Sequence, residues 1–256
     1  MKFKDCGIID SKLIKEIVKN YSTLDYAPKL RELVNIIYPK TNLDKYCKRD
    51  LHQKINELIL DGYDGEQVLK YRLFKVFQTA KLVAAYEIKV KNSRVDFLTV
   101  NGHTTSYEIK SNLDNLDKLV KQSGDYMDAF EFNNVVIHER HLNKCLEIIP
   151  RTFGIIMADK LGHTFIRKPI FNRSLNPATQ LSLLTKKEML KCFGHYDIKK
   201  VLDLFSAENI NELFKLSLKA RYRNRWDFIV EHAEEILPID LQFFFNKNIK
   251  PAHIYG

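Results

Sequence analysis

Cysteine and long apolar runs are scarce in this 256-residue chain, and each scarcity argues against a class of protein. The four cysteines are widely scattered and form no C-x-x-C pair, which argues against a zinc site or a disulfide framework. No uninterrupted apolar run approaches the length of a membrane-spanning helix, so we expect no membrane partner. The opening residues, MKFKDCG, lack the apolar stretch of a secretory signal. Free thiols suit a reducing compartment, and the expected location is therefore the cytoplasm.

Positive charge, by contrast, is in excess. The chain has 41 lysines and arginines against 32 aspartates and glutamates, a formal net charge of +9. This balance favours a polyanionic partner, chiefly nucleic acid, although a lysine-rich composition can also serve solubility alone. Its length is sufficient for one large domain or two smaller ones.

Two short β-type segments carry the most informative polar residues. Asp96 lies on the first (VDFLTV), and Glu108 and Lys110 lie on the second (TSYEIKS). Successive side chains of a strand point to opposite faces, so Glu108 and Lys110 share one face. The Asn101-Gly102 pair between the segments is a strong hairpin signal. Pairing of the two strands would therefore bring Asp96 beside Glu108 and Lys110.

Two carboxylates and an ammonium group in one pocket suit metal-assisted hydrolysis of a phosphodiester bond. Carboxylate oxygens bind hard divalent cations. Such a cation lowers the pKa of a bound water and stabilises charge on the phosphate. The lysine can orient that water or neutralise the developing charge. The plain alternative is a solvated strand face, on which Glu108 and Lys110 form a weak surface pair.

The order of an acid, an aspartate and a Glu-x-Lys triplet resembles the PD-(D/E)XK nuclease superfamily, with Asp96 and Glu108-Ile109-Lys110 as its core triplet. Val95 stands where the superfamily motif has proline. The resemblance is best over residues 80–160 and is to a group of little-characterised bacterial proteins. It implies a metal-dependent deoxyribonuclease, with an endonuclease favoured over an exonuclease. Its expected roles are restriction, defence against mobile DNA, or repair.

The resemblance also implies roles for the residues of the site. Asp96, Glu108 and the upstream acid Glu87 would hold Mg²⁺ or Mn²⁺, and the carbonyl of Ile109 would be a further ligand. Lys110 would assist the attacking water. All five are therefore candidate site residues.

Three more residues belong to this hypothesis. Glu66, on the helix before the first strand, is the rival of Glu87 for the upstream acid position. Gln122 and Tyr126 are four residues apart and share a helix face. Some members of the superfamily carry a glutamine and a tyrosine on this helix. Gln122 would support catalysis by contacting a phosphate or a metal-bound water, and Tyr126 would contact the nucleic acid.

Several basic side chains are candidates for contact with the phosphate backbone. Lys118 precedes Gln122 by one turn, and Arg140 lies near the expected end of a strand. The densest basic cluster lies further along the chain: Lys219, Arg221, Arg223 and Arg225. A solvated helix is the plain alternative for this cluster.

Hydrophobic periodicity predicts an α/β fold with three regions. Residues 1–62 form a helical N-terminal region, residues 63–170 a PD-(D/E)XK restriction-endonuclease-like core with a mixed central sheet, and residues 171–256 a helical C-terminal region. Within the core the expected order is α-β-β-β-α-β-α-β. The helix over residues 113–130 is expected to turn Leu113, Leu116, Val120 and Met127 toward the core. Residues 251–256 are expected to be a loose tail.

Two other functions stay open. A non-catalytic nucleic-acid-binding or protein-interaction module on the same fold would bind without metal and without Lys110, and its binding would weaken with salt. An RNA-directed nuclease would use the same site, and a comparison of DNA with RNA cleavage would distinguish it. DNA is the expected partner, and a homodimer or a protein partner is left open.

Overall fold

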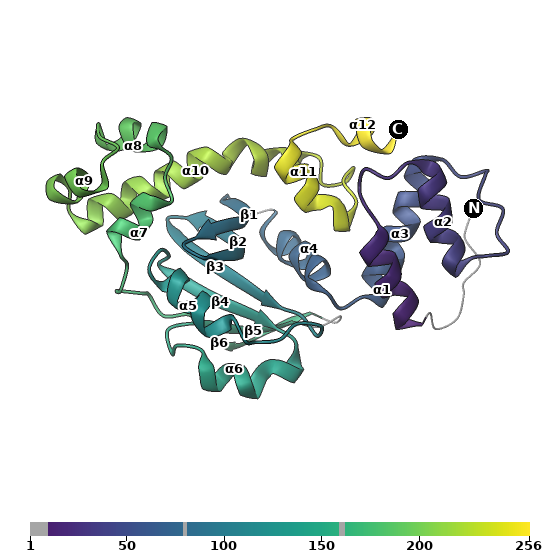
Figure 1. The fold of residues 1–256 in the computed structure, drawn as a ribbon, viewed down its shortest axis with the longest axis horizontal. Coiled ribbons are helices and arrows are strands. Elements are labelled where there is room, and N and C mark those ends of the chain that lie inside the picture. The colour runs from purple at the N-terminus through teal and green to yellow at the C-terminus, as the bar shows by residue number, and fades with distance from the viewer. Residues whose placement is uncertain (1–9, 79–80, 159–161) are drawn as a thin grey trace. The chain divides into compact units, whose positions relative to one another are not determined.

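The computed structural model describes residues 10–78, 81–158 and 162–256 (Figure 1). Contacts within the chain divide it into two compact units. Unit 1 combines the chain up to Arg72 with Phe228–Gly256, and unit 2 is Leu73–Asp227. These boundaries differ from the three regions expected from the sequence, because segments from both ends of the chain share unit 1. The first boundary falls inside helix α4 (Glu66–Phe77).

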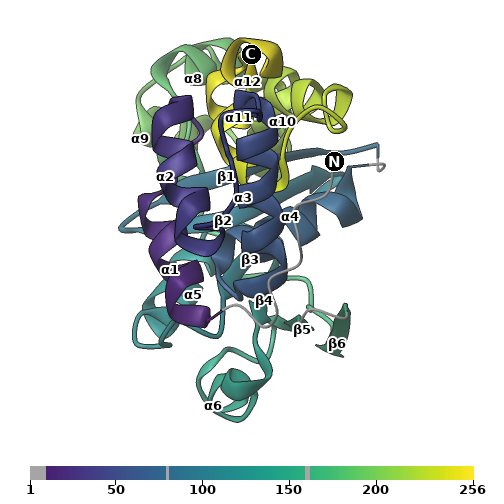
Figure 2. The ribbon, with the colours of Figure 1, turned by 90° about the vertical axis from the view of Figure 1, so that its right-hand side faces the viewer.

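Three helices build the first part of unit 1: α1 (Ser11–Asn20), α2 (Ala27–Ile37) and α3 (Lys48–Gly62). Figure 2 shows them side by side. Asp10 caps α1 by accepting a hydrogen bond from the Lys12 amide, which satisfies one of the amides left free at a helix start. The apolar faces of the three helices share a buried core that includes Ile17, Val34 and Ile55.

Later residues complete unit 1. They form the short 3-10 turn η2 (Pro238–Asp240) and the helices α11 (Leu241–Lys247) and α12 (Pro251–Tyr255). The expectation of a loose tail is therefore wrong. Tyr255 is buried and its hydroxyl donates to the carboxylate of Asp240 at 2.7 Å. Thr23, just after α1, donates to the same carboxylate at 2.7 Å.

A six-stranded mixed sheet forms the centre of unit 2, with its strands in the order of the chain. The strands are β1 (Val83–Val90), β2 (Ser93–Asn101), β3 (His103–Lys110), β4 (Phe132–Ile137), β5 (Gly154–Ala158) and β6 (His163–Arg167). The pairs β3–β4 and β4–β5 are parallel, and the other three pairs are antiparallel. The expectation of an α/β fold with a mixed sheet and flanking helices is confirmed at this level.

The hairpin between β2 and β3 forms where the sequence predicts it. Asn101 pairs with His103, and Gly102 between them has φ +74°. Glycine adopts this left-handed conformation without steric cost. Strand β6, however, was not expected. Four of its five residues are exposed and the fifth is half-buried, so it lacks the alternation that reveals a strand in a sequence.

Helices α5 (Leu119–Met127) and α6 (Leu142–Ile148) lie in the connections between the parallel strands (Figure 1). Helix α5 starts later than expected, and its buried residues are Leu119, Ser123 and Tyr126. Leu113 and Val120 are 43% and 57% exposed, so their predicted core positions are wrong. A local turn that begins at Ser111 keeps Leu113 out of the helix, since the Leu113 amide donates to the Ser111 hydroxyl at 3.2 Å.

The carboxylate of Asp114 accepts hydrogen bonds from both the amide and the hydroxyl of Ser111, at 2.7 and 2.5 Å. Serine and aspartate offer the backbone an alternative to helical hydrogen bonding in this way. The turn therefore holds the residues before α5 out of the helix that periodicity alone predicts.

Four helices follow the sheet: α7 (Pro177–Ser182), α8 (Lys186–Phe193), α9 (Ile198–Leu204) and α10 (Ala207–Glu231). Thr185 and Glu188 form a capping box at the start of α8, and Gly194 ends it with φ +69°. Among the described residues, no helix is both long and apolar enough to cross a membrane.

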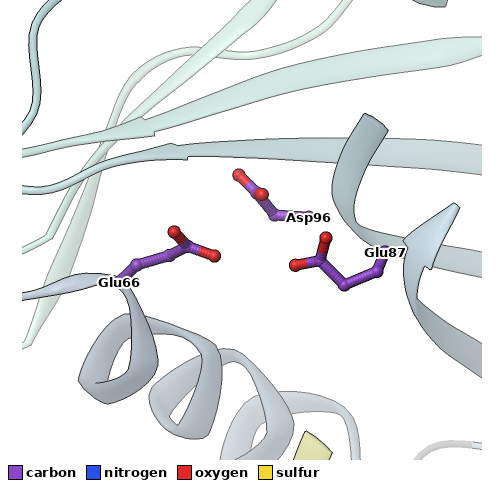
Figure 3. Close-up of side chains that lie close together, drawn as sticks. All are labelled: Glu66, Glu87 and Asp96. Carbon is purple, nitrogen blue, oxygen red and sulfur yellow. The ribbon is translucent and has the colours of Figure 1, made fainter. Parts of the chain in front are cut away.

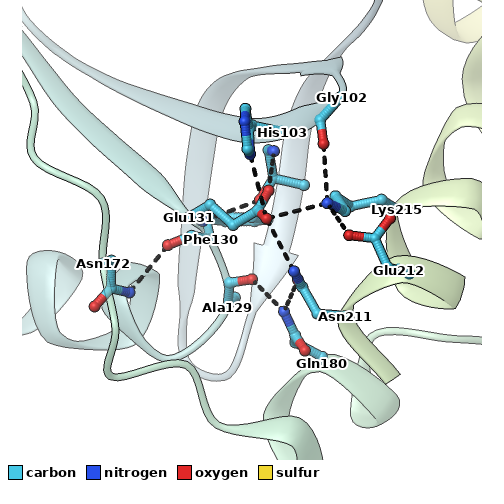
Figure 4. A network of polar contacts seen from close by, with 11 residues as sticks. Gly102, His103, Ala129, Phe130, Glu131, Asn172, Gln180, Asn211, Glu212 and Lys215 are labelled. Atoms are coloured by element: carbon cyan, nitrogen blue, oxygen red, sulfur yellow. Dashed lines mark hydrogen bonds and ion pairs between the residues drawn. The ribbon is translucent and has the colours of Figure 1, made fainter. Parts of the chain in front are cut away.

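A buried polar network ties α10 to the sheet (Figure 4). Glu131, just before β4, is 2% exposed and accepts hydrogen bonds from the Thr104 amide at 2.7 Å and from Asn211 at 2.9 Å. The ammonium group of Lys215 donates to Glu131 at 3.1 Å and to the Gly102 carbonyl at 2.9 Å. These contacts fix the N-terminal half of α10 beside the β2–β3 hairpin.

Candidate active site

The antiparallel pairing of β2 and β3 places Asp96 beside the end of β3. Backbone pairing runs from the hairpin as far as Phe97 and Tyr107. Beyond it, the carboxylate of Asp96 accepts a hydrogen bond from the amide of Ile109 at 2.6 Å. Asp96 is therefore next to the Glu108-Ile109-Lys110 triplet, as the hairpin hypothesis requires.

The carboxylate of Glu108 is the centre of the site. It is 1% exposed and accepts three hydrogen bonds of 2.6 Å. The donors are Lys110 on the same face of β3, and Gln122 and Tyr126 on one face of α5. The structure thus brings together four residues that the sequence predicted for one site.

Burial and neighbouring charges determine the protonation of this group. Burial raises the pKa of Glu108, and the contacts with Lys110, Tyr126 and Gln122 oppose that rise only in part. Burial also acts to lower the pKa of Lys110, but the adjacent Glu108 carboxylate more than offsets it, and the pKa lies above its ordinary value. Lys110 therefore keeps its proton at neutral pH and acts as a donor.

The Tyr126 hydroxyl is a fixed donor as well. Burial, together with the charge of Glu108, raises its pKa. Its oxygen lies 2.6 Å from Glu108 and 2.7 Å from the carbonyl of Arg94. Arg94 was not among the expected site residues, and the one signal for it in the sequence is its position two residues before Asp96.

Glu87 lies on β1 between Tyr86 and Ile88, whose partners on β2 are Phe97 and Val95, on either side of Asp96. Its backbone has φ +57°, a left-handed conformation that side-chain-bearing residues rarely adopt and that marks local strain. A carboxylate oxygen of Glu87 lies within 4.8 Å of one of Asp96, and Figure 3 shows the two groups pointing toward each other. Glu87 also forms a long ion pair of 3.6 Å with the exposed side chain of Arg94.

Figure 3 also draws Glu66, the first residue of α4. Glu66 belongs to unit 1, and its carboxylate pairs with the ammonium group of Lys70 at 2.5 Å. It stays a rival for the upstream acid position.

The oxygen donors of unit 2 fit a hard divalent cation. Glu87 and Asp96 hold like charges close together, an arrangement that a cation or a proton stabilises. The side-chain oxygen of Gln122 is buried, and it has no hydrogen-bond partner among the described residues. Ile109 lies between the two polar members of the triplet, and the role of its carbonyl as a ligand stays a prediction.

Of the two basic residues predicted to contact phosphate near the site, one is exposed and the other donates to a backbone carbonyl. Lys118 is exposed at the start of α5, one turn before Gln122. Arg140, in the 3-10 turn η1 (Glu139–His141), donates to the carbonyl of Asp114 at 2.6 Å. Arg140 therefore has a structural contact that the sequence did not indicate.

The basic cluster of α10 is not uniform. The guanidinium of Arg221 donates to Glu188 on α8 at 2.7 Å and to the Leu183 carbonyl at 2.9 Å. Arg223 pairs with Asp227 one turn later at 3.3 Å. Arg225 is exposed and Lys219 is half-buried on the same helix. The structure thus gives Arg221 a role in packing α8 against α10.

Comparison with known proteins adds one family. Residues 66–244 match the family model described as bacteriophage P4 protein cII. Among curated proteins, none matches the chain. A solved structure of a protein of unknown function from Silicibacter pomeroyi is 19% identical over 45% of this chain and 77% of its own, with a TM-score of 0.35. These matches name no activity, so the function has to be argued from the site.

Proposed function

Because the chain belongs to the family of bacteriophage P4 protein cII, whose description names no chemistry, we propose its function from the residues around Glu108. We propose a metal-dependent nuclease with a PD-(D/E)XK core that hydrolyses DNA phosphodiester bonds, acting as an endonuclease. Roles in restriction, in defence against mobile DNA or in repair agree with a family described from a bacteriophage.

The convergence on Glu108 carries this proposal. A carboxylate that is 1% exposed accepts from Lys110, Gln122 and Tyr126, and Asp96 reaches the next amide of the same strand. A solvated strand face, the plain alternative for this triplet, would leave Glu108 in water. Burial of charged groups at this density is typical of functional sites.

Glu87, Asp96 and Glu108 would hold Mg²⁺ or Mn²⁺, with the buried oxygen of Gln122 as a neutral donor. The bound cation would supply a water of lowered pKa and neutralise charge on the scissile phosphate. Lys110 holds its proton and donates it in a hydrogen bond to the phosphate oxygen on which negative charge accumulates. Tyr126 and the Ile109 amide fix the orientations of Glu108 and Asp96.

A cleavage assay tests the proposal. The purified chain is incubated with supercoiled, linear and single-stranded DNA in Mg²⁺, Mn²⁺ or EDTA. We expect cutting that requires metal and falls by about 100-fold or more in Lys110→Ala, since one lost donor to a developing charge costs on that order. Lys89→Ala, which removes an exposed lysine of β1, is the matched control and keeps full activity. Equal activity in Lys110→Ala would overturn the assigned site.

The upstream acid is tested separately. Glu87→Gln and Glu66→Gln are compared by titration calorimetry with Mn²⁺. Loss of binding in Glu87→Gln alone supports the assignment to Glu87. Loss in Glu66→Gln alone transfers the role to Glu66.

One observation favours a non-catalytic module as the second candidate. Both oxygens of Glu108 already accept from protein donors, so the network can hold α5 against β3 without metal. This candidate predicts DNA binding that weakens with salt, no cutting with any metal, and no change of binding in Lys110→Ala. An RNA substrate in the same assay distinguishes an RNA-directed nuclease.

A further inference from the structure

Unpaired positive charge gathers on α8 and α9, outside the candidate active site. Five exposed lysines fall within fifteen residues: Lys186, Lys187, Lys191, Lys199 and Lys200. Within the described residues, none of them forms an ion pair. We refer to these five residues as the α8–α9 lysine face.

Three acids lie among or just after these lysines: Glu188, Asp197 and the exposed Asp203. Glu188 binds Arg221 and the capping residue Thr185. Burial acts to raise the pKa of Glu188, but Arg221 and Thr185 outweigh it and hold the pKa below its ordinary value. Asp197 caps α9 by accepting from the Lys200 amide at 2.9 Å. Because Arg221 offsets Glu188, the five lysines outnumber the two remaining acids, Asp197 and Asp203, and the net charge of the lysine face is positive.

The backbone that carries these lysines is well fixed. Helix α8 has eight residues, the four residues from Gly194 to Asp197 form the turn, and α9 has seven residues. Met189, Phe193 and Val201 are buried, and Figure 1 shows α8 and α9 at one end of α10. Two short helices joined by a turn of three or four residues with a glycine are the elements of a helix-turn-helix.

The turn also presents an aromatic ring. Tyr196 is 57% exposed, and the ammonium group of Lys186 lies 5.6 Å from the centre of its ring. An exposed tyrosine among lysines offers a hydrogen-bond donor to a phosphate oxygen. Its phenol and the ammonium groups are complementary to a polyanion with regularly spaced charges.

We propose that the α8–α9 lysine face binds the phosphate backbone of double-stranded DNA, independently of metal. Duplex DNA presents one charge per about 1.7 Å of axis, which suits several separate point charges. An acidic membrane surface is the alternative polyanion, and the vesicle measurement below distinguishes it from duplex DNA. The binding does not require the nuclease activity proposed above.

Fluorescence anisotropy tests this inference, with the full chain, a labelled duplex and EDTA throughout. Two triple variants are compared. The face variant carries Lys186→Gln, Lys187→Gln and Lys191→Gln. The control variant carries the same change at three exposed lysines of α1: Lys12, Lys15 and Lys19.

We expect the face variant to bind at least about tenfold more weakly, and the slope of log K against log salt to fall by up to about 2.7, roughly 0.9 for each lost phosphate contact. The control variant keeps its affinity within about twofold. Circular dichroism checks that both variants fold.

Three outcomes overturn the inference: no duplex binding by the unchanged chain, an equal loss in both variants, or loss of binding to phosphatidylserine vesicles with duplex binding intact. Separate measurements distinguish this proposal from the nuclease proposal: duplex binding in EDTA tests the lysine face, and cutting in Mg²⁺ tests the site around Glu108.

Discussion

The hydroxyl of Tyr126 lies 2.6 Å from the carboxylate of Glu108, and both side chains are buried. This contact joins helix α5 to strand β3 and holds the Glu108 carboxylate in one orientation. It lowers the pKa of Glu108 against the larger effect of burial. The removal of one oxygen atom from Tyr126 is therefore a direct test of how the site controls its carboxylate.

Tyr126→Phe is expected to shift the acid limb of the pH–rate profile to higher pH. Loss of the donor raises the pKa of Glu108 further. The ionised carboxylate that a metal requires therefore forms only at higher pH. A hydrogen bond to a charged group is worth about 1.5–3 kcal/mol, so its loss is large enough to be seen in a pH–rate profile. The measurement is kcat/KM across about pH 5–9. A uniform fall in rate with an unmoved acid limb would contradict this account.

Glu87→Gly and Glu87→Gln are expected to separate backbone strain from metal binding. Both remove the carboxylate, so both are expected to lose Mn²⁺ affinity. Only glycine tolerates φ +57° without strain. Glu87→Gly is therefore expected to unfold with a free energy about 1 kcal/mol higher than Glu87→Gln. Urea denaturation of the two variants gives the comparison, and a less stable glycine variant would rule out strain at this position.

Lys215→Met is expected to destabilise unit 2 by about 3–5 kcal/mol, because it leaves the buried Glu131 without its cation. The double variant Glu131→Gln/Lys215→Met is expected to recover part of this loss. Urea unfolding followed by the fluorescence of Trp226, the single tryptophan, measures both. Lys144→Met, in a pair exposed on both sides, is the control and changes stability by about 0.5 kcal/mol or less.

The buried pair of Glu131 and Lys215 also predicts how the stability of unit 2 depends on pH. Burial acts to raise the pKa of Glu131, but the Thr104 amide, Asn211 and Lys215 outweigh it, and the pKa lies below its ordinary value. The stability that this carboxylate contributes is therefore complete above its unfolded-state pKa and is lost as pH falls through its folded-state pKa. Glu131→Gln is expected to flatten the loss of stability in acid. An unchanged acid dependence would disprove the assignment.

Arg221→Lys is expected to lower stability without weakening DNA binding. The guanidinium bridges Glu188 and the Leu183 carbonyl, and a lysine cannot reproduce that two-sided contact. The expected loss is about 1–2 kcal/mol, since the pair is only partly buried. Arg225→Lys, at an exposed position of the same helix, is expected to leave stability unchanged. Weaker duplex binding by Arg221→Lys at full stability would restore the phosphate-contact hypothesis.

Local signals predicted much of this fold. The Asn101-Gly102 turn defined the β2–β3 hairpin, and the four-residue spacing of Gln122 and Tyr126 placed both on one face of α5. Strand β6 was not predicted from the sequence, because its exposed residues give no alternating pattern. Helix α12 was not predicted either. It is held by the contact of Tyr255 with Asp240, and a local sequence pattern does not reveal a contact between residues this far apart in the chain.

In the candidate site, too, local spacing predicted some contacts and could not predict others. Two-residue spacing in a strand predicted the contact of Glu108 with Lys110, and four-residue spacing in a helix placed Gln122 and Tyr126 on one face. The conformation of Glu87 was beyond prediction, because nothing in its residue type favours a positive φ. The pairing of Arg221 with Glu188 was missed for a related reason: the two residues lie on different helices.

The carboxylate of Asp240 accepts from Thr23 near one end of the chain and from Tyr255 near the other. On a ribosome, the helices α1 to α3 emerge long before the residues that complete their core. Synthesis at about 5–20 residues per second inserts all of unit 2 between them, a delay on the order of ten seconds. Unit 2 therefore has time to fold before unit 1 can close, and a nascent chain stalled after α10 holds Thr23 without its acceptor.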